Sequence, residues 1–313
     1  MELYGLDSNP VPDGAVVGAI VTSDGVTLRY ARWRATARRS LGTVCLFQGR
    51  GETIERYFEV VGDLRRRGFA VAAVDWRGQG GSERRLRDPR KGHVDSFEEY
   101  DRDLEAFMEQ VALPDCPPPY FALAHSTGGL VCLRAVGQGR SRFTRMLLSA
   151  PLLGFGATRP SPAFSTRLAA FLTAIGLGEM RLPRSKAPPL ASLPFEGNGL
   201  TSDPRRFARN VEIARDLPGI GIGAPTFGWL HAAARAMGEV ADPDFGPAVT
   251  VPVLIVVGSL DRVISLPAIE EGVGQLRVGS QVVIAGARHD LMMERDSLRE
   301  QFFAAFDAFI PGT

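Results

Sequence analysis

The stretch Tyr120-Phe-Ala-Leu-Ala-His-Ser126-Thr-Gly-Gly129 decides the fold. A continuous apolar run leads directly into Ser126, and a helical pattern follows without a spacer. This is the strand–turn–helix context of a nucleophile elbow, in which small residues must stand two places from the serine. Ala124 and Gly128 are small, although glycine is usual at the first of these positions. We therefore expect Ser126 to be a nucleophile; the plainer alternative is a serine that caps a helix.

Further apolar runs on both sides of this elbow have the character of buried strands. They are Thr43–Phe47, Phe69–Val74, Tyr120–Ala124, Met146–Leu148 with its flanks, Pro252–Val257 and, more weakly, Gln281–Ala285. Most are unbroken rather than alternating, which is typical of strands covered on both faces. An earlier pair, Ala15–Thr22 and Thr27–Ala35, is joined by the turn residues 23–25 and predicts an antiparallel hairpin at the sheet edge.

Helical patterns separate these runs. They cover Ile54–Arg67, a segment opened by the capping-box pair Ser96 and Glu99, Ser126–Val136, Pro267–Leu276 and Met292–Ile310. Strands that alternate with helices predict an α/β fold, a mostly parallel sheet with helices on both faces.

The stretch 151–225 interrupts this alternation. It holds ten of the 22 prolines, nearly twice an even share of the 313 residues. It still contains an apolar helical pattern, Phe164–Leu177, and a helix start at Ser202-Asp203-Pro204, where proline suits the first helical position. We therefore expect one core, 1–150 and 226–313, interrupted by an inserted cap, 151–225.

A serine nucleophile needs a base, because its hydroxyl is weakly nucleophilic at neutral pH. His289 follows the last predicted strand, so it lies at the sheet edge that carries ligand chemistry in open α/β folds. Asp261 follows Pro252–Val257 and is the expected acid, which gives the order serine, acid, histidine of α/β-hydrolases. Asp290 is the rival acid, but it is next to His289 and less able to approach the far ring nitrogen.

A glycine-rich turn, Gln48-Gly-Arg-Gly-Glu52, follows the first buried strand. Such a turn can direct a backbone N–H toward a developing oxyanion, and the expected donors are the amides of Arg50 and Thr127. The alternative is an ordinary strand-to-helix turn. The Arg50 side chain either meets a phosphate or carboxylate or is simply solvated.

Together these motifs resemble the monoacylglycerol lipase and lysophospholipase L2-like branch of the α/β-hydrolases, also called the serine aminopeptidase family. The resemblance runs from Val21 onward. It rests on Gln48–Glu52, Asp75-Trp-Arg-Gly-Gln-Gly-Gly-Ser82, His125–Gly129, Asp261, His289 and, in the cap, Gly199–Phe207 with Ala224–Trp229. The family usually has His, Gly and His where Gln48, Ala124 and Gln79 stand.

The resemblance implies hydrolysis of monoacyl lipid esters, a lysophospholipid or a monoglyceride, through an acyl-enzyme. No metal or cofactor is implied. The alternatives are a small-ester carboxylesterase, an aminopeptidase that would grip an amine with cap acids such as Glu196 or Asp203, and a non-catalytic ligand-binding member of the fold.

The cap is expected to set specificity. Apolar side chains recur at helical spacing in it: Phe164, Leu168, Phe171, Leu172 and Ile175. The candidate substrate-binding residues are Phe164, Leu168, Phe171 and Trp229. The structural interpretation of this stripe is packing on the core. The functional interpretation is an acyl-binding wall or a membrane-facing lid. The basic loop Arg84, Arg85, Arg87, Arg90 and Lys91 is either solvated or attractive to anionic head groups.

The composition limits the classes of partner and the compartment that we expect for this protein. The formal net charge is +1, so no global field favours nucleic acid or another polyanion. The 3 cysteines, Cys45, Cys116 and Cys132, predict unpaired thiols rather than a disulfide framework or a zinc site. No secretory signal and no apolar run long enough for a membrane span is visible. We expect a cytoplasmic protein, with the option of peripheral contact with the inner membrane face.

Overall fold

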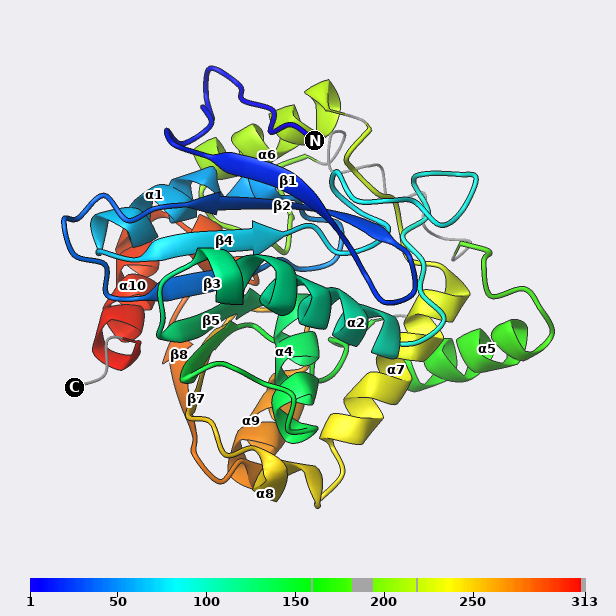
Figure 1. Cartoon of the computed structure of the whole chain (residues 1–313). Helices are drawn as coiled ribbons and strands as arrows, with labels where there is room; N and C mark the ends of the chain where they lie inside the picture. The colour runs from blue at the N-terminus through cyan, green and yellow to red at the C-terminus, as the bar shows by residue number, and fades with distance from the viewer. Residues whose placement is uncertain (159, 182–193, 218, 311–313) are drawn as a thin grey trace.

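The computed structural model describes residues 1–158, 160–181, 194–217 and 219–310. Within these ranges, a single sheet of eight strands runs in the order β1-β2-β4-β3-β5-β6-β7-β8 (Figure 1). The strands are β1 (Val16–Val21), β2 (Thr27–Trp33), β3 (Thr43–Phe47), β4 (Ala70–Val74), β5 (Tyr120–His125), β6 (Arg145–Ser149), β7 (Val253–Gly258) and β8 (Gly279–Ile284). The helices are α1 (Phe58–Arg66), α2 (Glu98–Phe107), α3 (Leu113–Asp115), α4 (Thr127–Gly137), α5 (Pro162–Ala174), α6 (Pro204–Asp216), α7 (Phe227–Val240), α8 (Phe245–Ala248), α9 (Leu266–Gln275) and α10 (Asp296–Phe309).

The direction of the strands agrees with the sequence analysis. From β4 to β8 every neighbouring pair is parallel, whereas β2 runs antiparallel to both β1 and β4. The predicted mostly parallel sheet with an antiparallel N-terminal edge is therefore confirmed. Parallel strands end at one edge, so the loops after β3, β5, β7 and β8 meet there.

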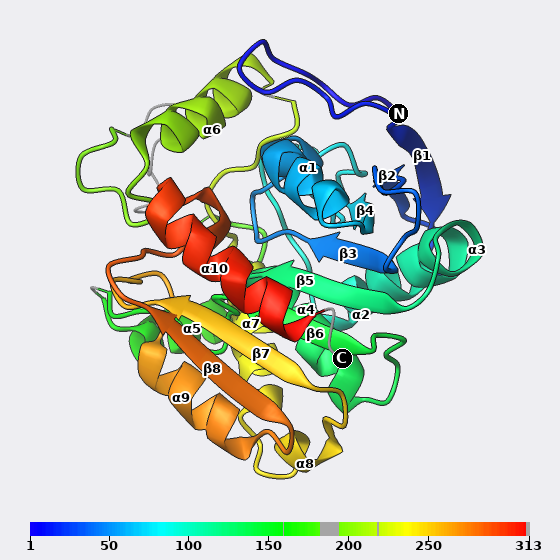
Figure 2. The same ribbon diagram turned by 90° about the vertical axis from the view of Figure 1, so that its left-hand side faces the viewer.

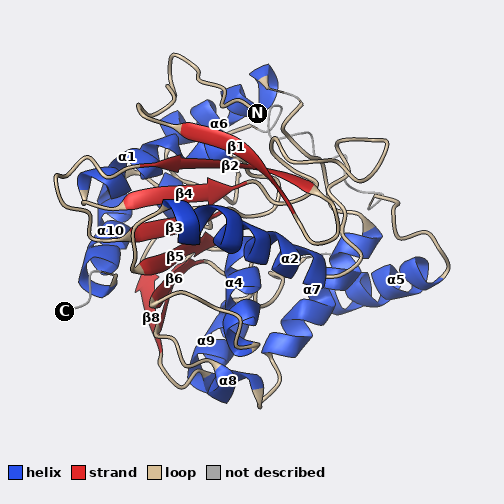
Figure 3. Ribbon diagram, viewed as in Figure 1, coloured by secondary structure: helices blue, strands red, loops and turns tan. Residues whose placement is uncertain are grey.

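Helices cover both faces of the sheet (Figures 2 and 3). Side chains alternate across each strand: Cys45 and Phe47 of β3 face the layer that contains α2, α4, α7 and α9, while Val44 and Leu46 face α1 and α10. Two apolar cores result, one on each face, which explains why the strands read as unbroken apolar runs.

Two helix starts differ from their predictions. Glu99 accepts hydrogen bonds from the amides of Asp95 (2.7 Å) and Ser96 (3.4 Å), but the Ser96 hydroxyl turns to Glu98, so only half of the capping box forms. The last helix begins at Asp296, not at Met292, because Glu294 is extended (ψ 165) and separates it from a short 3-10 turn. Local turn geometry outweighed the apolar periodicity there.

The predicted cap contributes α5 and α6, while its residues 159, 182–193 and 218 lie outside the described part. Asp203 caps α6 as predicted, accepting from the amides of Arg205 (2.8 Å) and Arg206 (2.9 Å). The two helices are far apart in the views of Figures 1 and 2, with α5 packed beside α7. No helix in the described ranges combines the length and apolarity that crossing a bilayer requires.

Candidate active site

Ser126 occupies the turn between β5 and α4. Its backbone angles are φ 49 and ψ −114, a conformation that a residue with a side chain adopts only at a cost of roughly 1–3 kcal/mol. The turn brings α4 close to the end of β3, and a Cβ atom at Gly128 would lie 2.7 Å from the carbonyl oxygen of Gln48. Glycine is therefore required at that position, which is the steric basis of the predicted elbow.

His289 and Asp261 are joined by a hydrogen bond. The imidazole Nδ1 lies 2.7 Å from Asp261 Oδ2, and both side chains are buried. The other carboxylate oxygen, Oδ1, accepts from the amides of Val263 (2.8 Å) and Ile264 (3.2 Å), which fixes the carboxylate. With Nδ1 donating to Asp261, Nε2 of His289 is left as a proton acceptor.

The Ser126 side chain has no internal partner. Among the described residues its hydroxyl makes no hydrogen bond, and the residue is 9% exposed. Its amide donates to Ser149 O (3.0 Å), so the backbone of the turn is anchored to β6 while the side chain stays available. This combination suits a group that must meet a substrate.

The turn after β3 packs directly on Ser126. A Cβ at Gly49 would lie 3.2 Å from the Cβ of Ser126. Within this turn the amide of Gly49 donates to Glu52 (2.6 Å) and that of Gly51 to Gln79 (3.1 Å). The Arg50 amide has no acceptor among the described residues, and neither has the Thr127 amide at the start of α4. One amide in the turn that packs on Ser126 and the amide of the residue after Ser126 are therefore both without an acceptor in the described part of the chain.

Gln79 and Glu52 hold the shape of this turn, a role that their positions in the sequence do not predict. The Gln79 amide nitrogen donates to Gly49 O (2.9 Å) and Glu52 O (3.0 Å), while its oxygen accepts from Gly51. A side-chain amide can make all three bonds at once, which a single imidazole cannot. The departure from the family's usual histidine at this position was the available signal.

The Arg50 side chain fits neither expectation: it is not simply solvated, and its hydrogen-bond partners are backbone carbonyls rather than a carboxylate. Its guanidinium donates to Gly223 O (3.0 Å) and Gly92 O (3.3 Å) and lies 4.9 Å from the ring centroid of Trp229. Burial lowers the pKa of Arg50 to about 10. The side chain thus fastens the predicted cap to the turn beside Ser126.

The four candidate substrate-binding residues lie in two different environments. Phe164, Leu168 and Phe171 are 57%, 37% and 61% exposed on the outer face of α5. These three side chains therefore do not pack on the core; α5 instead packs on α7 through Ala169, with Leu172 of the stripe partly buried at that contact. Trp229 is buried, and its Nε1 donates to the Tyr100 hydroxyl (3.1 Å).

One group of possible metal ligands occurs in the described part of the chain: His125, His289 and Asp290. The Asp290 carboxylate, however, already pairs with the Arg56 guanidinium, and Nδ1 of His289 is held by Asp261. The Arg56 guanidinium already neutralises the carboxylate that a metal ion would need as a ligand. The three residues therefore fit an ion-pair cluster better than a metal site.

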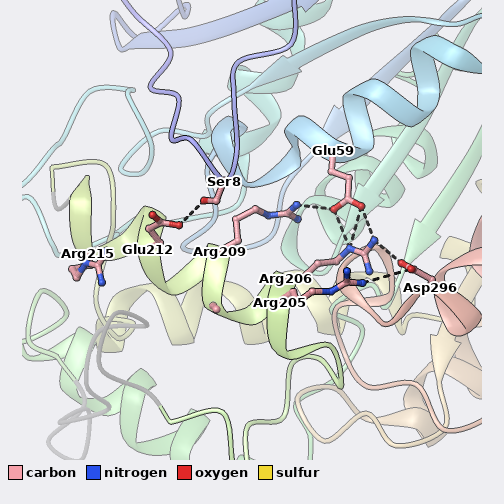
Figure 4. A pocket seen from close by; sticks show the side chains of 9 residues that line it. Ser8, Glu59, Arg205, Arg206, Arg209, Glu212, Arg215 and Asp296 are labelled. Atoms are coloured by element: carbon pink, nitrogen blue, oxygen red, sulfur yellow. Dashed lines mark hydrogen bonds and ion pairs between the residues drawn. The ribbon is translucent and has the colours of Figure 1, made fainter.

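A surface pocket of about 670 Å³ lies elsewhere, over α6 (Figure 4). Its walls carry both signs of charge: Glu59 of α1 accepts from Arg206 (2.6 Å) and Arg209 (2.7 Å), and Glu212 pairs with the Ser8 hydroxyl. The Glu59 contacts dock α6 on α1, and the Glu212 contact joins α6 to the segment before β1. The pocket contains none of the residues around Ser126.

Comparison with known proteins gives a consistent result. The family model described as serine aminopeptidase, S33, matches residues 38–296. Lysophospholipase L2 of Escherichia coli strain K12 is 31% identical over 297 residues, covering 88% of this chain and 82% of that protein. Monoglyceride lipase of Rattus norvegicus is 27% identical over 244 residues, covering 78% and 72%.

Solved structures show the same fold. A soluble variant of monoglyceride lipase from Saccharomyces cerevisiae, in complex with a substrate analog, superposes with a TM-score of 0.74 at 20% identity and covers 97% of each chain. A thermostable carboxyl esterase from Bacillus coagulans gives 0.73 at 17% identity, covering 96% of this chain and 98% of that one. The architecture is that of the α/β-hydrolases.

Proposed function

The chain belongs to the serine aminopeptidase S33 family of α/β-hydrolases, and from this premise we propose that it hydrolyses carboxylic esters of monoacyl lipids with Ser126 as the nucleophile. The observation that carries the proposal is the serine at φ 49, with a free hydroxyl, at the same edge of the parallel strands as a histidine whose Nδ1 is held by Asp261. Both relatives described above are named for monoacyl substrates, a lysophospholipid and a monoglyceride.

The reaction follows from these groups. Ser126 Oγ attacks the ester carbonyl while Nε2 of His289 takes its proton, and Asp261 stabilises the resulting imidazolium. The amides of Arg50 and Thr127 donate to the oxyanion. His289 returns the proton to the leaving alcohol, which leaves an acyl-Ser126 ester. Water, deprotonated by His289, then releases the fatty acid and restores the serine.

Aminopeptidase activity, which the family description names, is the second candidate. A peptidase of this kind needs a carboxylate that grips the substrate amine. Of the two acids considered for that role, Asp203 caps α6 and pairs with Arg206 (3.0 Å), while Glu196 is exposed. Neither is placed as a buried anion beside Ser126, so ester hydrolysis is the better supported reaction.

A substrate series tests the choice. We expect release of fatty acid from 1-acyl lysophosphatidylcholine and 1-monoacylglycerol, and a rise in kcat/KM along p-nitrophenyl esters from acetate to decanoate. Each added buried methylene contributes about 0.8 kcal/mol of binding, close to fourfold per carbon until the pocket is full. Highest activity on the acetate, or on an aminoacyl p-nitroanilide, would defeat the lipid assignment.

We also propose that residues 151–225 act as the specificity cap. Contacts on both sides of Ser126 support this: Leu200 O accepts from the amide of Asp290 (2.8 Å), next to His289, and Gly223 O accepts from the Arg50 guanidinium (3.0 Å). The cap thus touches both the loop of the base and the turn that supplies an oxyanion donor. A substrate that enters between them must fit against the cap.

The exposed stripe on α5 supports peripheral membrane contact through the cap. Phe164, Phe171 and Ile175 are more than half exposed, and α5 contains Arg167 but no acidic residue. The basic loop contributes less, because Arg85 pairs with Asp95 (2.5 Å) and Arg90 with Asp88 (3.4 Å). A helix with an apolar outer face and no negative charge suits an anionic lipid surface.

Vesicle co-sedimentation measures this contact. We expect binding to phosphatidylglycerol vesicles at low salt and a loss of about 10²-fold or more for the double variant Phe164→Ser/Phe171→Ser, since each exposed ring contributes roughly 1.5–3 kcal/mol when buried. Leu113→Ser, at an exposed apolar site on α3, is the matched control and should bind like the parent protein. No binding by the parent protein, or equal binding by the double variant, would remove the membrane role.

A further inference from the structure

A cluster of buried charged side chains lies directly behind the nucleophile turn. It consists of Glu52, Arg56, Tyr57, His125 and Asp290, which come from the turn after β3, the 3-10 turn that follows it, the end of β5 and the loop after β8. The four side chains in it that can carry a charge, those of Glu52, Arg56, His125 and Asp290, are each at most 9% exposed. The reaction described above uses none of these groups, so their burial needs another explanation.

His125 faces oxygen acceptors with both ring nitrogens. Nδ1 lies 3.0 Å from the carbonyl oxygen of Ser149, and Nε2 lies 3.3 Å from Asp290 Oδ1 and 3.8 Å from Glu52 Oε1. A neutral imidazole has one N–H, so one nitrogen lone pair would face an oxygen lone pair. An imidazolium donates in both directions and satisfies the site.

The charges balance only when His125 is protonated. Arg56 pairs with Glu52 (2.8 Å) and with Asp290, and the Tyr57 hydroxyl donates to Glu52 (2.6 Å). One arginine cannot neutralise two buried carboxylates, and an imidazolium supplies the second positive charge. The neighbouring ring of His289, at a centroid separation of 4.7 Å, carries no fixed charge while it serves as the base.

The pKa directions agree with this geometry. Burial alone would lower the pKa of His125, but Glu52 and Asp290 raise it above the ordinary value. Burial would raise the pKa of Asp290, but Arg56 and His125 hold it below its usual range. Both groups are therefore stabilised in their charged forms.

The cluster joins the two sides of the proposed active site. Glu52 Oε2 accepts from the Gly49 amide (2.6 Å), the residue before the proposed oxyanion donor Arg50, and Asp290 is the residue after His289. Building on the proposed function, we propose that His125 is a positioning residue: as a buried imidazolium it holds the oxyanion turn, through Glu52, and the loop of the catalytic base, through Asp290, in register around Ser126.

The pH dependence has a definite sign. Because the pKa of His125 is raised on folding, its contribution is complete below the ordinary histidine value of about 6.5 and is lost as the pH rises through the folded value. The catalytic base, in contrast, must lose its proton to work. We therefore expect activity to decline on the alkaline side of the pH profile, as His125 loses its proton.

His125→Gln separates these two effects. Glutamine keeps a donor and an acceptor but carries no charge, so we expect kcat/KM to fall about 10²-fold through kcat, as for a small misplacement of reacting groups, with KM little changed. The alkaline decline should be absent from the variant's profile. His231→Gln, on α7 and outside the cluster, is the control and should keep the parent profile. An unchanged alkaline decline in His125→Gln would overturn the proposal.

Nitrogen-15 NMR of histidine-labelled protein tests the proton directly and does not depend on activity. At pH 7 we expect one buried histidine, assigned by its loss in His125→Gln, with both ring nitrogens protonated, and Asp290→Asn should shift its titration to lower pH. A neutral His125 at pH 7 would overturn the proposal even if the enzyme cleaves lipid esters. Failure of the parent protein to cleave esters would overturn the proposed function and leave the NMR result to decide the state of His125.

Discussion

Ser126→Ala should reduce hydrolysis of monoacyl esters by about 10⁵-fold or more while the protein stays folded. The hydroxyl oxygen forms the covalent bond in the proposed reaction, and no other described side chain around the turn replaces it. The hydroxyl makes no internal hydrogen bond, so its removal leaves no buried group unpaired. The measurement is kcat/KM for 1-acyl lysophosphatidylcholine, with circular dichroism as the check on folding.

Ser149→Ala is the matched control for this variant. Ser149 ends the neighbouring strand β6 and is buried, and its hydroxyl has no hydrogen-bond partner among the described residues. Ser149→Ala also removes one buried hydroxyl, from the residue whose carbonyl accepts from the Ser126 amide, but it leaves the nucleophile in place. Ester hydrolysis that survives in Ser126→Ala and falls in Ser149→Ala would reverse the assignment.

Asp261→Asn should lower kcat by about 10⁴-fold with little change in KM. The carboxylate accepts from His289 Nδ1 at 2.7 Å and from two backbone amides through its other oxygen. An asparagine that keeps its oxygen toward the amides turns its NH₂ toward the imidazole, which then presents the wrong tautomer to Ser126. Steady-state kinetics at several pH values measure the loss.

Asp290→Asn provides the contrast, because Asp290 was the rival acid in the sequence. Its carboxylate faces Arg56 and His125 rather than Nδ1 of His289. We expect a loss well below that of Asp261→Asn, on the order of 10²-fold, from disordered positioning alone. A larger loss for Asp290→Asn than for Asp261→Asn would show that Asp290, and not Asp261, orients His289.

The architecture was largely predictable from the sequence, for a physical reason. Strands buried on both faces must be apolar on both sides, so β3, β4, β5 and β7 appear as continuous apolar runs. The turn at Ser126 tolerates only small neighbours, which left a readable pattern at Ala124 and Gly128. The proposed triad follows from order along the chain, because parallel strands deliver their loops to one edge.

Three-dimensional contacts decided the features that the sequence did not reveal. His125 and Asp290 pair although they are 165 residues apart in the sequence, so no short motif could have predicted the contact. The same holds for Arg50, whose side chain turns to Gly223 in the cap. The stripe from Phe164 to Ile175 has the periodicity of a core helix, yet all of it except Leu172 is exposed, because periodicity defines a face without saying what covers it.

Covalent trapping of the nucleophile tests the central claim most directly. Incubation with an alkyl fluorophosphonate, proteolysis and mass mapping should find one adduct, on the peptide that contains Ser126, and the adduct should form more slowly when 1-monoacylglycerol competes for the site. His289→Ala should suppress its formation, because the serine then lacks its base. An adduct on another serine, or equal labelling of Ser126→Ala, would contradict the account.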